Sequence, residues 1–176
     1  MHLNNKKKVV VIGPESTGKS TLSEALAEEL HTVWVPEYAR SYLENINHPY
    51  IENDLLAIAH GQIESEDKLL PDANNILICD TDLYVLKVWS EHKYYHCDKW
   101  ILEQIAKRKY DLYLLTYIDI DWQEDPQREY PSGAMRTYFY NIYLDLIQNS
   151  NVPWVDIRGD ENTRLKNALD TINNIL

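Results

Sequence analysis

Short apolar runs alternate with segments of helical periodicity along almost the whole chain. Five runs have the length and composition of buried strands, and polar residues, Gly or Pro bound them. They are residues 7–12, 32–35, 75–80, 111–116 and 153–157. Because these runs are apolar on both strand faces, the pattern predicts a parallel sheet with helices covering each side.

The segments between the runs place apolar residues three or four positions apart, as one face of an α-helix requires. The predicted helices cover residues 19–30, 37–45, 53–70, 83–91, 98–109, 135–148 and 162–175. Alternating strands and helices predict three layers, and ligands of such sheets bind beyond the carboxyl ends of the strands.

The clearest chemical signal is a glycine-bounded loop within VVVIGPESTGKSTL, between the first strand and the first helix. Residues 13–20 fit the phosphate-loop pattern G-x-x-x-x-G-K-S/T, in which backbone N–H groups surround phosphate oxygens. The Lys19 ammonium reaches the β and γ phosphates, and the Ser20 hydroxyl ligates magnesium. A glycine turn that only caps a helix is the alternative, but every fixed position matches. We expect ATP contacts from Gly13, Glu15, Ser16, Thr17, Gly18, Lys19, Ser20 and Thr21.

Two carboxylates follow the third strand in the stretch ILICDTD. Asp80 comes after four apolar residues, the position from which a Walker B carboxylate orients the water shell of Mg²⁺. We predict that Ser20 and Asp80 form the metal site. Asp82 has two interpretations, because it is placed either to cap the next helix or to hold the hydroxyls of an acceptor.

The stretch VPEYAR, after the second strand, offers another carboxylate for an acceptor hydroxyl. Glu37 is the candidate, and a helix-start acid is the competing interpretation. Glu37 or Asp82 could orient or deprotonate the hydroxyl, and the sequence does not choose between them. Tyr38 and Trp122 are candidate ring partners for an aromatic substrate, although most aromatic residues in such chains belong to the core.

A polar, proline-bearing segment, residues 118–132, follows the fourth strand and predicts a lid. Arg128 and Arg136 are spaced to close over phosphates, where they would neutralise charge and keep water from a transferring phosphoryl group. A solvated surface loop is the alternative for either arginine alone. The absence of the guanine motif N-K-x-D disfavours a GTPase switch, and the chain is short for a ring ATPase.

Composition restricts the partners more than the chemistry. The chain has 176 residues, 44% of them hydrophobic, which suits one domain spanning residues 1–176. A net charge of −11 disfavours general nucleic-acid binding. No apolar stretch approaches the length of a membrane span or a signal-peptide core, so we expect a cytoplasmic protein without a membrane partner.

Together these motifs resemble the ribosylnicotinamide kinase domain of the NadR proteins, P-loop enzymes of NAD salvage. The resemblance covers residues 7–157 and rests on GPESTGKSTL, VPEYARSYLE, ICDTDLYVLKVWSE, YDLYLLT and DWQEDPQRE, in this order and spacing. The phosphate loop is common to many families. The combination of EYAR, DTD and the W-x-x-D-P-x-R lid segment is far more specific.

The resemblance implies a P-loop NTPase three-layer αβα sandwich of the nucleoside/nucleotide kinase type, with a five-stranded parallel sheet. It implies ATP-dependent phosphorylation of the 5′-hydroxyl of nicotinamide riboside to nicotinamide mononucleotide. Lys19, Ser20 and Asp80 would handle ATP and magnesium, and the lid would carry Asp125 and Arg128. The residues that would face the nucleoside are Glu37, Tyr38, Arg40, Asp82, Trp122 and Asp125. Arg158 follows the fifth strand, at the position where adenine often binds in similar kinases.

A stand-alone kinase is expected, because neither the DNA-binding region nor the adenylyltransferase domain of some NadR proteins is recognisable. The single His-Gly pair, His60-Gly61, is not the H-x-G-H of such transferases. Two alternatives stay open. One is a P-loop kinase for another nucleoside or small metabolite, and the other is a regulatory ATPase module.

Overall fold

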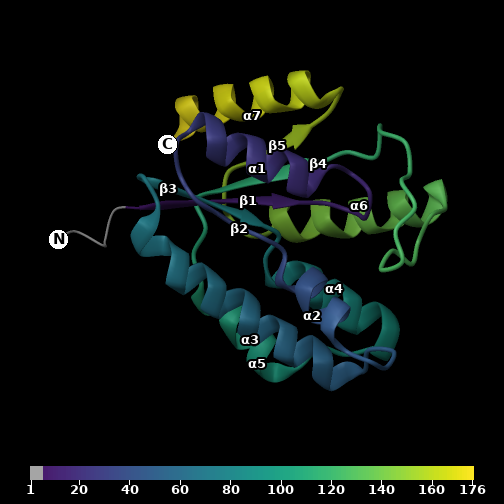
Figure 1. The fold of residues 1–176 in the computed structure, drawn as a ribbon. Coiled ribbons are helices and arrows are strands. Elements are labelled where there is room, and N and C mark those ends of the chain that lie inside the picture. The colour runs from purple at the N-terminus through teal and green to yellow at the C-terminus, as the bar shows by residue number, and fades with distance from the viewer. Residues whose placement is uncertain (1–5) are drawn as a thin grey trace.

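A five-stranded parallel sheet divides the helices into two layers in the computed structural model, which describes residues 6–176 (Figure 1). Residues 1–5 of the predicted domain lie outside the described residues. The strands are β1 Lys7–Ile12, β2 Trp34–Val35, β3 Ile76–Asp80, β4 Leu112–Thr116 and β5 Trp154–Ile157. Their order is β2-β3-β1-β4-β5. Because β1 is central, the loop that follows it opens between the carboxyl ends of β3 and β4.

The register of the sheet sets the distances at this edge. Val11 is level with Asp80 of β3, and Ile12 is level with Leu115 of β4. The last residue of β3 therefore lies beside the start of the loop after β1. Parallel pairing thus joins two motifs that are about sixty residues apart in the sequence.

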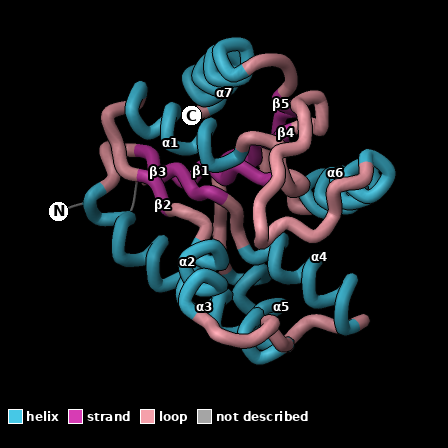
Figure 2. The backbone as a smooth tube through the Cα atoms, turned by 45° about the vertical axis from the view of Figure 1, so that its right-hand side comes forward, coloured by secondary structure: helices cyan, strands magenta, loops and turns pink. Residues whose placement is uncertain are grey.

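Seven α-helices are assigned within residues 6–176. They are α1 Lys19–Glu29, α2 Tyr38–Asn45, α3 Glu52–Leu69, α4 Leu83–Tyr94, α5 Lys99–Lys107, α6 Gly133–Gln148 and α7 Glu161–Ile175, with a short 3-10 helix, η2, at Leu70–Asp72. Helices α1 and α7 cover one face of the sheet, and α6 lies on the other face with the group α2 to α5 (Figure 2). None of the helices in the described residues has both the length and the apolar character needed to cross a membrane.

Alternate residues of the strands pack against opposite layers. Val9 and Val11 pack with α1 and α7, whereas Val10 and Ile12 pack with α4 and α6. All four side chains are fully buried. Burial of each such side chain stabilises the fold by about 1.5–3 kcal/mol, so β1 is held firmly from both sides.

Helices α2 to α5 enclose a hydrophobic cluster of their own, apart from the two that pack on the sheet faces, with Ala39, Leu55, Ile58 and Ile101 among its buried residues. Gly61 of α3 is part of this packing, because a Cβ there would lie 2.1 Å from the Tyr38 ring. The close approach of the ring to α3 fixes the position of α2, and α2 follows directly on the loop after β2.

The predicted parallel sheet, its five strands and its helices are confirmed, with shifts at the ends. Strand β2 is shorter than predicted, because Thr32 belongs to the turn that follows α1 and not to the strand. Its N–H donates to the Ala27 carbonyl at 2.9 Å, and His31 before it has a left-handed φ of 50°. Helix α6 begins earlier, at Gly133, since the Ser132 hydroxyl accepts from the Met135 N–H and caps it.

Candidate active site

The loop after β1 has a backbone shape that two glycines permit. A Cβ at Gly13 would lie only 2.3 Å from Thr116 Oγ1, so the loop can approach β4 only without a side chain there. Gly18 caps α1 with a left-handed φ of 74°. The loop ends at the N-terminus of α1, where free N–H groups and the helix dipole favour a phosphate group.

Polar contacts hold the loop in this shape. Thr17 Oγ1 lies 2.7 Å from Thr116 Oγ1, and the Lys19 ammonium donates to the Pro14 carbonyl at 2.8 Å. A cavity of about 160 Å³ opens over the loop. Its loop side is lined by the predicted ATP contacts of the loop itself, which are Gly13, Glu15, Ser16, Thr17, Gly18, Lys19, Ser20 and Thr21.

Ser20 and Asp80 meet at the edge of this cavity, as predicted for a metal pair. The Ser20 hydroxyl donates to Asp80 Oδ2 at 2.5 Å. The other carboxylate oxygen, Oδ1, is buried and has no hydrogen-bond partner. Burial and the nearby Glu37 raise the pKa of Asp80 to about 6. A buried oxygen without a partner beside a hydroxyl fits Mg²⁺, which takes one or two protein oxygens and completes its shell with water and phosphate.

The wall opposite the loop comes from α2, α4 and α6. It is formed by Glu37, Arg40, Leu43, Val85, Trp89 and Tyr143. This wall combines one carboxylate, one guanidinium and two aromatic rings, so it has the polar and apolar groups needed to hold a ring-bearing molecule.

Glu37 is the predicted carboxylate that reaches the cavity. It precedes α2, but its side chain makes no capping hydrogen bond to that helix. Its charge contributes to the raised pKa of Asp80, which places the two carboxylates close together. Glu37 therefore lines the cavity while it also stands at the start of α2, and its role as an acceptor-facing carboxylate stays a prediction.

Asp82 does not line this cavity; it caps α4, as one of its two interpretations predicted, and it lines a small neighbouring cavity of about 10 Å³ together with Glu37 and Val85. Its Oδ1 accepts from the Tyr84 N–H at 3.0 Å and caps α4, and its Oδ2 accepts from the Tyr113 hydroxyl at 2.7 Å. Only 3% of the residue is exposed, and burial raises the pKa of its carboxyl to about 7. The chain changes direction between Asp80 and Asp82 at Thr81, whose φ is 70°, an unusual value for a β-branched residue.

Tyr38 and Trp122 do not line the cavity either. The Tyr38 ring packs on Gly61, as described above, and lies 6.3 Å from Tyr42. The Trp122 ring belongs to the predicted lid segment, with the Arg128 guanidinium 5.8 Å from its centre. The rings that reach the cavity are Trp89 and Tyr143, which sequence reasoning missed. The available signal was the four-residue spacing of Val85 and Trp89 on one face of the helix after DTD.

The segment between β4 and α6 lies against the loop and has the position of a lid. The Glu15 carboxylate accepts from the N–H groups of Glu129 and Tyr130 at 3.1 and 3.0 Å. Arg128 lines the cavity and donates to Ser16 Oγ at 3.4 Å. Asp125 forms an ion pair with Arg40 at 2.9 Å, so it joins the lid to α2 instead of lining the cavity.

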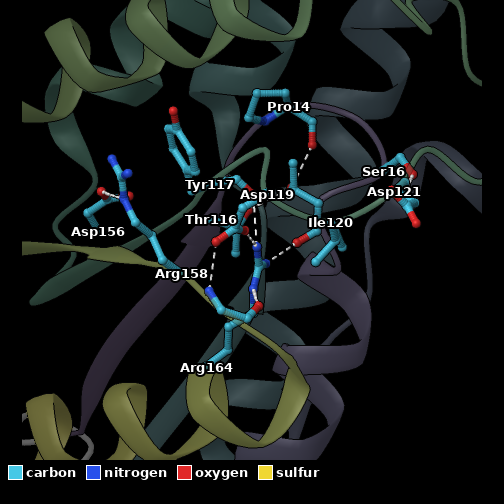
Figure 3. A network of polar contacts seen from close by, with 12 residues as sticks. Pro14, Ser16, Thr116, Tyr117, Asp119, Ile120, Asp121, Asp156, Arg158 and Arg164 are labelled. Atoms are coloured by element: carbon cyan, nitrogen blue, oxygen red, sulfur yellow. Dashed lines mark hydrogen bonds and ion pairs between the residues drawn. The ribbon is translucent and has the colours of Figure 1, made fainter. Parts of the chain in front are cut away.

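The remaining two arginines have other positions than predicted. Arg136 is 7% exposed, does not line the cavity and donates to the Ser16 carbonyl at 2.9 Å, so it holds the loop from outside. The Arg158 guanidinium lies 3.6 Å from the centre of the Tyr117 ring and pairs with Asp156, away from the loop (Figure 3). Its neighbour Gly159 instead lines a second cavity of about 700 Å³, adjoining the first at Gly18.

The fold and the site together define a P-loop protein with a five-stranded parallel sheet between two helical layers. A sequence profile of the family described as "AAA domain" matches residues 8–164, which is most of the chain. The chain belongs to this AAA-domain family of P-loop proteins.

Two curated relatives have the same name, "Trifunctional NAD biosynthesis/regulator protein NadR". The one from Escherichia coli (strain K12) is 26% identical over 159 residues, which are 87% of this chain and 38% of the relative. The one from Salmonella typhimurium is 26% identical over 156 residues, 85% of this chain and again 38% of the relative. The chain thus spans about two fifths of the length of these relatives, and the resemblance to NadR proteins is confirmed.

Solved structures agree on the fold. A crystal structure of NadR protein in complex with NR has a TM-score of 0.77 at 23% identity, covering 99% of this chain and 52% of that chain. Thymidylate kinase from Ehrlichia chaffeensis has a TM-score of 0.64 at 16% identity, covering 96% of this chain and 99% of that chain.

Proposed function

We propose that the chain is an ATP-dependent kinase that phosphorylates the 5′-hydroxyl of nicotinamide riboside to give nicotinamide mononucleotide. One observation carries the proposal. A single cavity is bounded on one side by the phosphate loop and on the other by Glu37, Trp89 and Tyr143. A donor phosphate and a ring-bearing acceptor can therefore meet in one site, which phosphoryl transfer requires.

The donor side binds the triphosphate of ATP. Backbone N–H groups of the loop would hold the phosphate oxygens, and Lys19 would release the Pro14 carbonyl to neutralise the β and γ phosphates. Ser20 and Asp80 would hold Mg²⁺, which lowers the charge on the transferring group when it is bound. Arg128, already in the cavity wall, would stabilise the same charge from the lid.

The acceptor side holds the nucleoside with its 5′-hydroxyl toward Glu37. The carboxylate of Glu37 takes the hydroxyl proton while the new O–P bond to the γ-phosphorus forms and the bond to the β-phosphate oxygen breaks, and ADP leaves. Trp89 and Tyr143 supply ring faces that suit the flat, positively charged nicotinamide ring. Arg40, fixed by Asp125, joins this wall to the lid.

The test is magnesium- and ATP-dependent ADP release with and without nicotinamide riboside, with the product followed by mass. The proposal expects release that needs the riboside and a product heavier by one phosphoryl group. Glu37→Gln should lower turnover on the order of 10²- to 10⁴-fold, the usual contribution of a positioned base. Glu44→Gln, on the exposed side of the same helix, is the matched control.

Other outcomes assign other functions. Phosphorylation of a different nucleoside in a substrate panel would keep the kinase and replace the acceptor. Slow ATP hydrolysis that no acceptor stimulates would favour the regulatory ATPase.

A further inference from the structure

Arg164 is a buried arginine near the start of α7 that donates to four groups on three separate segments. Its Nη1 donates to the Thr17 carbonyl at 2.6 Å, and its Nη2 donates to the Tyr117 carbonyl at 2.9 Å and to Asp119 Oδ1. Its Nε donates to the Gly159 carbonyl at 2.7 Å. Figure 3 shows the side chain rising from α7 into the gap between these segments. Only 3% of the residue is exposed.

Stability alone does not account for an arginine in this place. Moving a guanidinium out of water costs several kcal/mol, and an apolar residue of similar volume often packs as well or better. Asp119 is the single carboxylate paired with Arg164 in the described residues, and its side chain is still 29% exposed. The other acceptors are neutral main-chain carbonyls. The guanidinium therefore serves to hold backbone segments in fixed orientations.

One of these segments is the phosphate loop itself. In a trans peptide, the carbonyl of one residue and the N–H of the next point in opposite directions. Arg164 holds the Thr17 carbonyl and Arg136 holds the Ser16 carbonyl, so the N–H groups of Gly18 and Thr17 point away from the two arginines. The next N–H groups along the chain belong to the first turn of α1, which forms the rest of a phosphate cradle.

The electrostatics agree with a cradle that is shaped for an anion. Burial lowers the pKa of Arg136, and repulsion from Arg128 and Arg164 lowers it further. Two guanidinium groups thus act on the Arg136 guanidinium beside one loop. A bound phosphate group would relieve this repulsion, and the loop would not need to rearrange to receive it.

The other segment held by Arg164 is the turn after β5. Asp119 Oδ2 accepts from the Gly159 N–H at 2.7 Å, while Arg164 donates to the Gly159 carbonyl. Asp119 stays ionised for this role: burial opposes ionisation, but the Gly159 amide and Arg164 together lower the pKa of its carboxyl. This turn and Gly18 both line the 700 Å³ cavity beside the loop.

We propose that Arg164 is a positioning residue of the donor site, which sets the orientation of the Thr17-Gly18 peptide for phosphate binding and fixes the Gly159 turn beside it. One side chain would then connect the phosphate loop to the 700 Å³ cavity beside it, where the other end of the donor would bind. The proposal rests on the donor half of the proposed function and does not depend on the acceptor.

Calorimetric titration of the full chain with ADP and magnesium, adenosine alone and pyrophosphate alone tests this role without any acceptor. Arg164→Gln should weaken ADP binding on the order of 10- to 100-fold, as expected when several hydrogen bonds from a charged donor are lost. The same substitution should weaken the binding of adenosine and of pyrophosphate by a smaller factor than the binding of ADP. Arg164→Lys, which keeps the charge but not the planar fork, should fall between Arg164→Gln and the wild-type chain.

The control is Lys166→Gln, which removes a charge from the exposed side of the same helix and should leave all three dissociation constants unchanged. A folded Arg164→Gln chain that binds ADP within twofold of wild type would overturn the proposal. Reduced binding stoichiometry with an unchanged dissociation constant would also overturn it, because that result reports partial unfolding. A wild-type chain that binds ADP but phosphorylates no riboside would refute only the acceptor assignment, whereas one that binds no ADP would overturn both proposals.

Discussion

The surroundings of Asp82 predict both the sign and the size of its effect on how the free energy of unfolding depends on pH. Its carboxyl is buried, and burial raises its pKa from an ordinary value of 3.8 to about 7. The group keeps its proton in the folded state over a pH range in which the unfolded chain has already lost it. Stability from this group is therefore fully present below about pH 4 and is lost as the pH rises to about 7.

The change that isolates this effect is Asp82→Asn. The amide cannot ionise, and its shape preserves both contacts: the carbonyl accepts from the Tyr84 N–H, and the amide donates to the Tyr113 hydroxyl. At about 1.4 kcal/mol for each tenfold change in ionisation constant, the rise in pKa corresponds to about 4 kcal/mol. We expect Asp82→Asn to exceed wild type in free energy of unfolding by up to this amount at pH 8.

Urea denaturation of both proteins between pH 4 and pH 8 measures the difference. Contributions from other titrating groups are common to both proteins and cancel. The gap should grow from near zero at pH 4 and level off above pH 7. A gap independent of pH, or one that narrows as the pH rises, would show that Asp82 is ionised in the folded state. Turnover of the same variant is informative too, because retained activity would leave Glu37 as the candidate base.

Three further predictions concern the metal, the lid and the packing of α2. Asp80→Asn should raise the Mg²⁺ concentration needed for half-maximal turnover on the order of 10- to 100-fold, and an unchanged magnesium titration would contradict the assigned metal pair. Glu15→Ala removes the acceptor for two lid N–H groups, so deuterium should exchange faster at Glu129 and Tyr130, whereas Glu24→Ala on the exposed side of α1 should leave that exchange unaltered. Gly61→Ala should lower the free energy of unfolding by about 1–3 kcal/mol through collision with the Tyr38 ring, which outweighs a gain of up to about 1 kcal/mol in helix propensity. A variant as stable as wild type in urea would argue against that packing.

The sheet and the phosphate loop were predictable because their signals are local. A strand buried on both faces is a continuous apolar run, and the loop has fixed residues at fixed spacing. Asp80 was predictable for the same reason, since it ends such a run. Its pairing with Ser20 follows from the parallel register of β1 and β3.

The acceptor wall was harder to predict, because its residues come from distant helices. Trp89 and Tyr143 meet only once α4 and α6 have packed on the same face of the sheet. Tyr38 adjoins Glu37 in the sequence, yet its ring turns toward the glycine at position 61. Arg164 was missed for a related reason. Its importance comes from carbonyl groups, and these have no side-chain signature in a sequence.

Thr81 separates two aspartates that a regular strand would place on one face. Side chains two residues apart in an extended chain point the same way, so Asp80 and Asp82 would otherwise compete for one space and repel each other. The left-handed backbone at Thr81 costs on the order of 1–2 kcal/mol and turns the second carboxyl toward Tyr113. Replacing Thr81 with glycine would remove that strain and also the constraint on where each acid points. A substitution chosen to stabilise the protein at this position would therefore weaken the separation of the predicted metal-binding carboxylate, Asp80, from the helix-capping one, Asp82.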